Sequence, residues 1–350
     1  METADKKDIR ALTREDLRGF FEAMGERAFR GDQVFEWLWK KGAHSFEDMT
    51  NLSLKHREML TARFTINHIA VDQMQRSQDG TIKNAVRLHD GLVVESVLIP
   101  TENRTTACVS SQVGCSLDCR FCATARLKRM RNLNADEIFD QVVVIDRQSR
   151  LYFGRPLSNI VFMGMGEPLM NYPNVVKAIR MISSEEGLGM SPKRITVSTS
   201  GVPKMIRKLA DENLRCNLAV SLHAAVDATR TSIMPFNAKM PLGELREAIG
   251  YWYGQTRSRI TYEYVVWEGV NDSPEDVRAL LEFCKAAPCK VNLIEYNPID
   301  GGAFQQASED AIQAYVRALE NAGITVTVRR SRGKDIDAAC GQLANKSAAG

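Results

Sequence analysis

The chain lacks long apolar runs, a secretory leader and any strong excess of charge. No stretch approaches the roughly twenty apolar residues that a membrane-spanning helix requires, and residues 1–7 are polar, unlike the start of a signal peptide. There are 46 Lys and Arg against 43 Asp and Glu, and the net charge of +3 is too small to establish a polyanionic partner. We therefore expect a soluble cytoplasmic protein without a membrane contact. Its 350 residues, 44% of them apolar, allow one large α/β domain and a small appendage.

Cysteine is scarce and unevenly placed. A chain of this length with 8 Cys is expected to hold reduced thiols and metal ligands rather than a secreted disulfide framework. Cys216, Cys284 and Cys289 lie in strand-like or helix-end contexts, where we expect buried thiols. The other notable cysteines form the run CSLDCRFC, which gives Cys115, Cys119 and Cys122 a CxxxCxxC spacing.

Three thiolates on one short segment can hold an iron–sulfur cluster. A four-iron cluster would keep one iron without a protein ligand, and an open iron can bind a substrate and pass it an electron. The alternative is a zinc site completed by a distant Cys or His. Structural zinc sites usually pair two-Cys knuckles with two-residue spacers, and the sequence has no second knuckle. The spacing therefore favours a cluster with Cys115, Cys119 and Cys122 as its ligands.

The first hundred residues follow a different pattern from the rest. Apolar residues at helical spacing predict helices within residues 13–25, 32–41 and 54–64. Asp79-Gly80 and Asp90-Gly91 then predict hairpin turns in a small antiparallel sheet. We divide the chain into a helical accessory domain, an antiparallel β extension, a core and a C-terminal segment, at 1–68, 69–100, 101–335 and 336–350.

From about residue 105, strands and helices alternate. Strand-like runs lie at 106–110, 159–164, 194–198, 217–222, 260–266, 291–296 and 325–329, and helix-like stretches at 134–150, 173–186, 242–253, 274–286 and 308–322. Such alternation predicts parallel strands joined by helical crossovers. The spans suit either a barrel or a doubly wound sheet.

Polar and glycine-rich segments follow several of these strands. The runs GMGEP (164–168), STSG (198–201), SLH (221–223) and NP (297–298) each come directly after a predicted strand. Each alone could be an ordinary connection, but the working groups of a parallel β/α core lie at this end of its strands. Gly164 and Gly166 would let the backbone approach a ligand closely. The segments together predict a binding rim.

Longer motifs resemble a known family. VSSQVG (109–114) precedes the first cluster cysteine, RNL (131–133) follows the last, and DIDAACGQL occupies 335–343. Together they resemble the RlmN/Cfr family of radical S-adenosylmethionine RNA methyltransferases over nearly the whole chain. The resemblance implies a partial (β/α)6 radical-SAM barrel with a small N-terminal helical domain and a short antiparallel β extension. It also implies one [4Fe-4S] cluster per chain and S-adenosylmethionine, two molecules of which are consumed per methylation.

The resemblance assigns roles to individual residues. Cys340 would be methylated by one S-adenosylmethionine, and a radical made from the second would remove a hydrogen from that methyl. The carbon radical would add to an adenine ring, Glu95 would accept the ring proton, and Cys108 would release the product by forming a disulfide with Cys340. S-adenosylmethionine would contact Gly166, Glu167, Ser198, Ser221, Leu222, His223 and Asn297.

Without the resemblance, the same residues would be interpreted more plainly. Cys340 would be an inert thiol near the C-terminus, on what we expect to be a mobile loop. His223 would be a structural histidine, and we keep it only as a cofactor contact. Glu95 would be a polar residue on the outer face of a half-exposed strand.

The family activity is methylation of adenine carbon-2 in 23S ribosomal RNA near the peptidyl-transferase centre, and in tRNA beside the anticodon. The nearest alternative is the Cfr type, which methylates carbon-8 of the same ribosomal base; RGKDID (332–337) and NL (132–133) are closer to RlmN. A rival from another class is a non-catalytic RNA-binding protein with a structural metal. We expect a flavodoxin-like or other low-potential electron donor, and a monomer.

Two basic runs and the N-terminal module are the candidates for holding RNA. The runs contain no acidic residue and flank the segments assigned to the chemistry. Such runs are often only solvated faces, but here they favour contacts with RNA phosphates. Their basic residues are Arg126, Lys128, Arg129 and Arg131, and Arg329, Arg330, Arg332 and Lys334.

Overall fold

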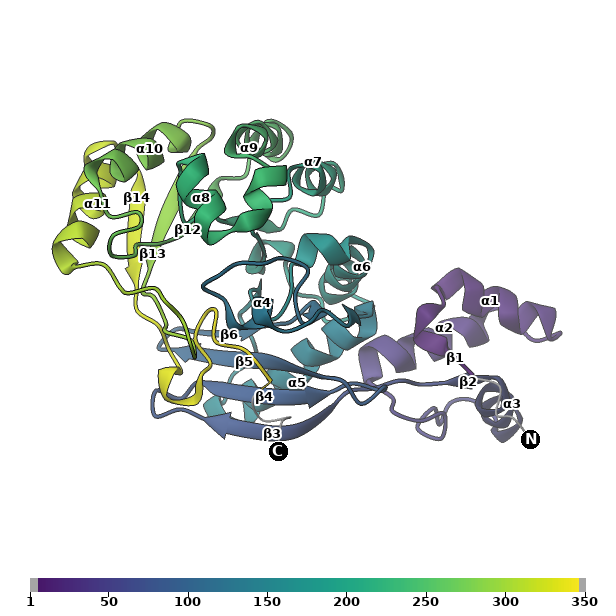
Figure 1. The fold of residues 1–350 in the computed structure, drawn as a ribbon. Helices are drawn as coiled ribbons and strands as arrows, with labels where there is room; N and C mark the ends of the chain where they lie inside the picture. The colour runs from purple at the N-terminus through teal and green to yellow at the C-terminus, as the bar shows by residue number, and fades with distance from the viewer. Residues whose placement is uncertain (1–5, 346–350) are drawn as a thin grey trace.

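One sheet organises the molecule (Figure 1). The computed structural model describes residues 6–345, so residues 1–5 and 346–350, at the outer ends of the first and last predicted segments, lie outside the described part. The sheet has ten strands in the order β14-β13-β12-β11-β10-β9-β6-β5-β4-β3. Within the described residues, no helix is long and apolar enough to cross a bilayer.

The part of the sheet from β6 to β14 is parallel and confirms the predicted alternation. Its strands are β6 (Arg104–Cys108), β9 (Asn159–Phe162), β10 (Ile195–Thr199), β11 (Asn217–Ser221), β12 (Ile260–Val265), β13 (Cys289–Ile294) and β14 (Thr325–Arg329). The crossover helices are α5 (Ala135–Phe153), α6 (Tyr172–Ser183), α7 (Pro203–Asp211), α9 (Leu242–Thr256), α10 (Pro274–Cys284) and α11 (Glu309–Asn321).

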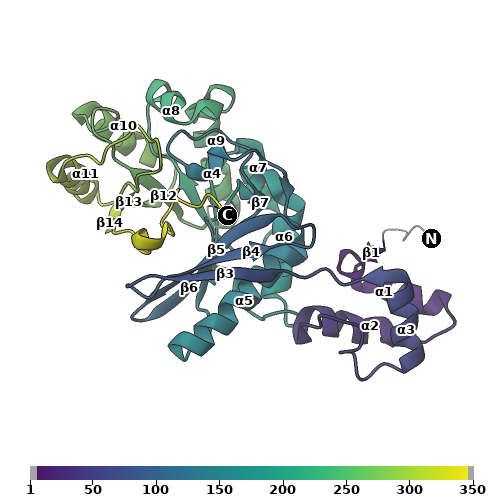
Figure 2. The same cartoon turned by 60° about the horizontal axis from the view of Figure 1, so that its bottom comes forward.

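These helices line the outer side of the curved sheet (Figures 1 and 2). Strands such as β12 are buried along their whole length, as expected where both faces are covered. Because β14 and β3 are the two ends of the strand order, the sheet forms an open, partial barrel. The sequence pattern did not predict α7 or the short helix α8 (Asp227–Ile233).

The antiparallel part of the sheet contains β3 (Ala70–Arg76), β4 (Ile82–Arg87) and β5 (Val93–Thr101). The predicted turns are present, and Gly80 and Gly91 have the positive φ values of 85° and 81° that favour glycine there. The strands do not form a separate sheet as expected, because β5 pairs with β6 and so joins the parallel part. The extension and the core therefore share one sheet, and the boundaries at 68, 100 and 335 stay a division predicted from sequence.

The N-terminal module contains three helices and a small parallel ladder. Thr13 and Asp16 form a capping box at the start of α1, as the sequence suggested. The predicted second helix starts earlier, at Phe29, and its last turn widens into a π-helix that ends at the left-handed Gly42. The elements are β1 (Lys7–Asp8), η1 (Ile9–Ala11), α1 (Arg14–Ala23), α2 (Phe29–Glu36), η2 (Trp37–Lys41), α3 (Leu54–Arg63) and β2 (Phe64–Thr65).

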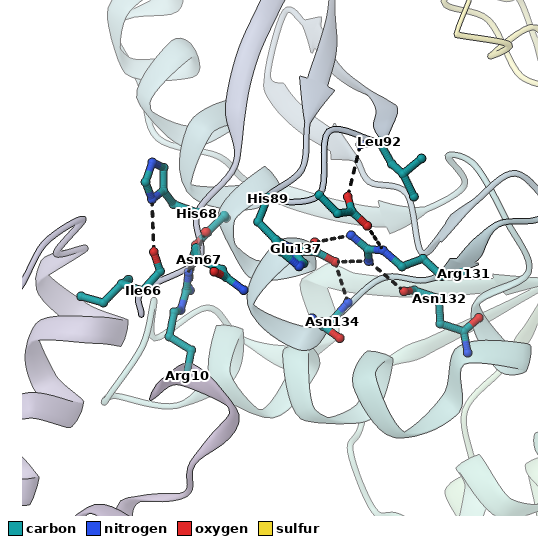
Figure 3. A network of polar contacts seen from close by, with 12 residues as sticks. Arg10, Ile66, Asn67, His68, His89, Leu92, Arg131, Asn132, Asn134 and Glu137 are labelled. Atoms are coloured by element: carbon teal, nitrogen blue, oxygen red, sulfur yellow. Dashed lines mark hydrogen bonds and ion pairs between the residues drawn. The ribbon is translucent and has the colours of Figure 1, made fainter. Parts of the chain in front are cut away.

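A buried arginine attaches this module to the core. Arg10 donates to both carboxylate oxygens of Asp140 on α5, at 2.6 and 2.8 Å. It also donates to the carbonyl of Asn67 at 3.5 Å (Figure 3). Its guanidinium lies 4.7 Å from the ring centre of Trp39. Trp39 is itself buried and therefore belongs to the core of the module rather than to a surface that could contact nucleic acid.

The remaining elements are short. Those that follow the carboxyl ends of parallel strands are β7 (Gln112–Val113), α4 (Ala123–Arg126), β8 (Arg131–Asn132), η3 (Pro168–Asn171), η5 (Pro235–Lys239) and η6 (Lys334–Ile336). η4 (Pro192–Arg194) directly precedes β10.

Candidate active site

A cavity opens where the carboxyl ends of the parallel strands meet the cysteine loop and the C-terminal segment. It encloses about 1070 Å³ of empty space, a figure that includes open solvent at its mouth. Its lining brings together most of the predicted site residues: Cys115, Cys119, Cys122, Gly166, Glu167, Ser198, Ser221, His223, Asn297 and Cys340. Three predicted residues, Leu222, Cys108 and Glu95, are not part of this lining.

The three clustered cysteines lie on the loop between β7 and α4. Gly114 makes this loop possible, because a Cβ there would lie 2.6 Å from the carbonyl oxygen of Lys128. Burial raises the pKa of Cys115 to about 12, and it raises the pKa of Cys119 well above the usual value. Neutral thiols are therefore favoured until a cation replaces their protons.

The three thiols share one cavity. Cys115, Cys119 and Cys122 all line it. Among residues 6–345, no group of three or more Cys, His, Asp or Glu side chains is already arranged as the ligands of one metal ion. Three thiols on one wall are the residue type that holds an iron–sulfur cluster or, with a further ligand, a zinc ion.

The glycines of the GMGEP run serve packing within the protein. A Cβ at Gly164 would lie 2.7 Å from Ser110 Oγ, and one at Gly166 would lie 2.5 Å from the Cβ of Gln112. The sequence predicted that the backbone at these glycines approaches a ligand closely. In the structure it approaches residues Ser110 and Gln112, which follow β6. Gly166 still lines the cavity.

Glu167 and the loop after β10 are bonded to each other. The two carboxylate oxygens of Glu167 accept the N–H groups of Leu169 at 3.0 Å and Ser200 at 2.8 Å. Burial raises the pKa of Glu167, and these donors oppose the rise. A carboxylate accepts more than two hydrogen bonds, so Glu167 can still accept one from a cofactor ammonium.

His223 is neutral and fixed in orientation. Its Nδ1 accepts the N–H of Val265 at 3.2 Å, which leaves the proton on Nε2. Burial, with a smaller contribution from the Arg230 guanidinium, lowers the pKa of His223 to about 3. Its ring packs edge-on against Phe121 with 4.9 Å between ring centres. These contacts suit a polar wall of a binding site and exclude an imidazolium.

The sequence gave no sign of a buried arginine beneath the rim. Arg230 donates to the carbonyls of Ser200 and Leu222 and to Asn237 Oδ1. It thereby joins the ends of β10 and β11, which carry Ser198 and Ser221. The side chain of Leu222 is fully buried, so only its backbone belongs to this arrangement. No motif marks Arg230, because most of its partners are backbone carbonyls, which leave no trace in the residue types.

The C-terminal segment closes one side of the cavity and is bonded to the core. The Asn297 amide donates to the carbonyl of Cys340 at 3.3 Å, the Ala123 N–H donates to the carbonyl of Gly341 at 2.7 Å, and Thr124 Oγ1 donates to the carbonyl of Leu343 at 2.7 Å. The expected mobile loop is therefore bonded to the core in this structure. Asn297 Oδ1 is buried without a partner, which leaves an acceptor available to a cofactor N–H group.

Cys340 and Cys108 lie close enough for their charges to interact. The Cys340 thiol is accessible from the cavity, yet the protein around it raises its pKa by desolvation while Arg329 lowers it. Cys108 ends β6 and is buried, which raises its pKa, and a thiolate at Cys340 would raise it further. Both thiols are free in this structure.

Glu95 is buried, unlike the half-exposed residue that its strand pattern suggested. Only 1% of it is exposed. Its Oε2 accepts the N–H groups of Ala344 at 2.8 Å and Asn345 at 3.1 Å, and its Oε1 lies 3.4 Å from Lys83 Nζ. The prediction failed because the C-terminal segment covers this face of the strand.

The strand register places Glu95 and Cys108 on the same face. Glu95 stands opposite Ala85, and Val97, two residues further along β5, stands opposite Cys108. Opposed residues of antiparallel strands, and alternate residues of one strand, point to the same side of a sheet. The other face is covered by α5, where Asn84 and Gln148 exchange side-chain hydrogen bonds at 2.9 and 2.7 Å.

Most of the two basic runs is bonded within the protein. Arg131 binds both oxygens of Glu137 at 2.8 Å and Asp90 at 2.6 Å, and Glu137 also accepts from the N–H of Asn134 at 2.8 Å and lies 3.1 Å from His89 (Figure 3). Arg126, Arg329, Arg332 and Lys334 likewise bind carbonyl or carboxylate groups. The basic residues left for phosphate contacts are Lys128, Arg129 and Arg330, which are exposed and make no hydrogen bond or ion pair among the described residues.

An open β/α barrel with three cavity-facing cysteines on one loop defines a radical S-adenosylmethionine enzyme. The sequence model of the Radical SAM superfamily matches residues 109–284, and that of the ribosomal RNA large subunit methyltransferase N-terminal domain matches residues 7–66. A radical SAM methyltransferase from Sphaerobacter thermophilus superposes with a TM-score of 0.89 at 41% identity, over 96% of this chain and 99% of that one.

Two curated relatives narrow the class further. The probable dual-specificity RNA methyltransferase RlmN of Flavobacterium johnsoniae is 71% identical over 98% of this chain and 99% of its own. The dual-specificity RNA methyltransferase RlmN of Geotalea uraniireducens is 45% identical over 97% of both chains. The chain belongs to the RlmN family.

Proposed function

We propose that this protein methylates carbon-2 of adenine in 23S ribosomal RNA near the peptidyl-transferase centre and in tRNA beside the anticodon, through a methyl group carried on Cys340. The observation that carries the proposal is the position of the C-terminal segment. This segment brings Cys340 into the cavity that Cys115, Cys119 and Cys122 line. Ala344 and Asn345 of the same segment donate hydrogen bonds to Glu95.

The bound cofactors would supply one part of the chemistry. A [4Fe-4S] cluster on the three cysteines, with S-adenosylmethionine on its open iron, supplies the one-electron cleavage that yields a hydrogen-abstracting radical. On this rim, Glu167 and Asn297 would hold the amino-acid part of S-adenosylmethionine. Ser198, Ser221 and His223 would hold its nucleoside part. The family consumes a second S-adenosylmethionine to methylate Cys340, and we propose the same here.

Cys340 would carry the methyl carbon to the ring. Its sulfur is reached from the cavity, so a methyl on it can lose a hydrogen there and the resulting carbon can bond to adenine. An adenine ring carbon is not nucleophilic enough for ordinary transfer from a sulfonium. The covalent route avoids this difficulty, because bond formation starts from a carbon radical held by the protein.

Glu95 and Cys108 would complete the reaction. Addition of the carbon radical leaves one unpaired electron on the adduct, and this electron would return to the cluster. The Glu95 carboxylate accepts the ring proton, so a C–H bond breaks, its electron pair stays with the ring and an O–H bond forms. The Cys108 thiolate then attacks the sulfur of Cys340: an S–S bond forms, the bond between that sulfur and the transferred carbon breaks, and the carbon keeps that electron pair and takes up a proton, which completes the methyl group. The pKa of Cys108 is raised by burial, so this attack needs a base or a shift of the C-terminal segment that admits water.

The partners follow from this chemistry. We propose that RNA phosphates contact the N-terminal module and the exposed Lys128 and Arg129, and that the target adenine leaves its stack to reach the cavity. A flavodoxin-like or other low-potential donor would reduce the cluster. The protein would act as a monomer in the cytoplasm.

Mass spectrometry of RNA nucleosides tests the function directly. A strain that lacks the gene should lose 2-methyladenosine from 23S ribosomal RNA and tRNA, and the wild-type gene should restore it. Restoration of 8-methyladenosine instead would identify the Cfr-type reaction. No change in any methyladenosine, together with a colourless purified protein, would support the non-catalytic RNA-binding alternative.

A further inference from the structure

The antiparallel strands contain a buried lysine that the chemistry above does not use. Lys83 lies on β4, is 5% exposed, and has its Nζ 3.4 Å from Glu95 Oε1. Among the described residues, Glu95 is the only carboxylate with which it forms an ion pair. Lysine is almost never buried unless it is paired. Stability alone does not require this pair, because apolar residues of similar volume often replace a buried ion pair without loss.

Lys83 lies on the face of the sheet that carries the proposed chemistry. It stands opposite Val97 on β5, and Val97 stands opposite Cys108 on β6. Opposed residues of antiparallel strands point to the same side, so Lys83, Glu95 and Cys108 share one face. The C-terminal segment covers this face, since the N–H groups of its Ala344 and Asn345 donate to Glu95.

The partners of the Glu95 carboxylate belong to two different parts of the chain. Its Oε2 is occupied by the N–H groups of Ala344 and Asn345, on the segment that carries Cys340. Among the described residues its Oε1 has no hydrogen-bond partner, and it lies 3.4 Å from Lys83 Nζ. An adenine placed between Cys340 and Glu95 must take over the space and the bonding of those N–H groups. Lys83, on a paired strand within the sheet, does not depend on the segment.

We propose that Lys83 is a positioning residue that keeps the Glu95 carboxylate ionised and oriented once the C-terminal segment has released it. This inference rests on the proposed function of Glu95 as the proton acceptor. A buried carboxylate that loses its hydrogen bonds and has no counter-ion takes up a proton from solvent. It could not then accept one from the ring.

The Lys83 ammonium also favours the later release of the ring proton from Glu95 to solvent. When the C–H bond of the ring breaks and its electron pair stays with the ring, the new O–H bond neutralises Glu95. Lys83 is then a buried cation without a counter-ion, which favours release of that proton to solvent. The pair thereby returns to its starting charge after each turnover.

The test compares Lys83→Met, Lys83→Arg and Glu95→Gln with the wild type in single-turnover reactions on a 23S ribosomal RNA fragment. Lys83→Met keeps most of the volume and removes the charge, and we expect it to slow product formation by about 100-fold, the order of a general-base contribution. Lys83→Arg restores a cation and should recover most of the rate. The covalent protein–RNA adduct should accumulate in Lys83→Met and decay faster as the pH is raised.

A double variant separates positioning from a structural role. In a Glu95→Gln background there is no carboxylate to hold ionised, so Lys83→Met should cause less than about a twofold further change. An equal loss in both backgrounds would overturn the proposal, as would a wild-type rate in Lys83→Met. If Lys83→Met does not fold, Lys83→Gln replaces it and must meet the same conditions.

The result also distinguishes this inference from the proposed function. If wild-type protein forms no methyladenosine in the same assay, the function itself is wrong. If the wild type is active and Glu95→Gln is not, but Lys83→Met keeps the wild-type rate, only the role of Lys83 is wrong. Lys290→Met is the matched control, since Lys290 is half-buried near the amino end of β13, outside the cavity lining, and should keep the wild-type rate.

Discussion

The two parts of the sheet differ in what they contribute to the cavity. The parallel strands β9 to β13 end at a rim that carries Glu167, Ser198, Ser221, His223 and Asn297, and the cysteine loop faces them. The antiparallel strands β4 and β5, with β6, place Lys83, Glu95 and Cys108 on one face instead. The first part is suited to holding a cluster and its cofactor, and the second to handling a methyl group and a proton.

The C-terminal segment connects the two parts. It bonds to Asn297 on the parallel side through the carbonyl of Cys340, and to Glu95 on the antiparallel side through Ala344 and Asn345. Under the proposed function, these three strands and this segment would add methyl transfer to the radical SAM core. Variants on the parallel side should abolish the radical, whereas variants on the antiparallel side should stop the reaction after it has begun.

The largest effect should come from the parallel side. Replacement of Cys119 by Ala should remove iron and sulfide from the anaerobically purified protein and reduce methylation to background, because a three-ligand site loses one ligand. Cys216→Ala is the control, since Cys216 is buried outside the cavity lining and should leave the iron content unchanged. Stoichiometric zinc without iron in the wild-type protein would contradict the cluster assignment.

On the antiparallel side, Cys108→Ala should halt the reaction after the carbon–carbon bond has formed. We expect a protein–RNA adduct that migrates slowly on a denaturing gel, and turnover reduced by more than about 100-fold, because no thiol remains to form the disulfide. Iron content should stay normal, which distinguishes this variant from Cys119→Ala. Free protein with normal RNA methylation would reject the role of Cys108.

A smaller effect is expected on the segment itself. In Glu95→Gln the amides of Ala344 and Asn345 lose bonds to a charged acceptor, each worth about 1.5–3 kcal/mol. Hydrogen exchange of the C-terminal peptide should therefore quicken about 10-fold or more. Glu282→Gln, an exposed control on α10, should not change it. Unchanged exchange in Glu95→Gln would mean that Glu95 does not hold the segment.

The smallest effect on methylation should come from a substitution outside the parallel and antiparallel parts of the sheet. Burial raises the pKa of Asp136, at the start of α5, to about 6, above the value of about 3.9 for an unfolded Asp. Folding therefore favours the protonated form, and this contribution to stability is present below about pH 4 and lost as the pH rises through about 6.

Asp136→Asn removes the carboxylate whose ionisation lowers the folding stability as the pH rises. The free energy of unfolding at neutral pH, measured with urea, should rise by about 2 kcal/mol and depend less on pH between these values. Methylation should be unaffected. Glu320→Gln, an exposed residue of α11, serves as the control for charge removal. A lower stability of Asp136→Asn at neutral pH would show that Asp136 is held ionised in the folded protein.

The parallel side was predictable from sequence because its signals are local. The CxxxCxxC spacing, the strand and helix alternation, and the polar runs after the strands each occupy one short stretch. Helix α7 was missed although it is amphipathic, and Arg230 was missed because it bonds to backbone groups that no motif marks.

The antiparallel side depends on contacts between distant residues, so residue patterns alone interpreted it less well. Glu95 resembles a residue on a solvated strand until β5 pairs with β6 and the C-terminal segment, some 249 residues away in sequence, covers it. Arg131 was likewise interpreted as a free basic residue, because its partners Asp90 and Glu137 lie outside its own basic run. Only the family resemblance pointed to Glu95 and Cys108, and no sequence signal pointed to Lys83.

Isotope counting in the product tests the central claim most directly. The account has a carbon radical on the Cys340 methyl add to adenine, so S-adenosylmethionine with a fully deuterated methyl should give methyladenosine that carries two deuterons, and deoxyadenosine that carries one. Cys340→Ala should give no product while it keeps the cluster, because nothing then holds the methyl in the cavity. Methyladenosine with three deuterons, or an active Cys340→Ala protein, would contradict the account even if the RNA substrate were correct.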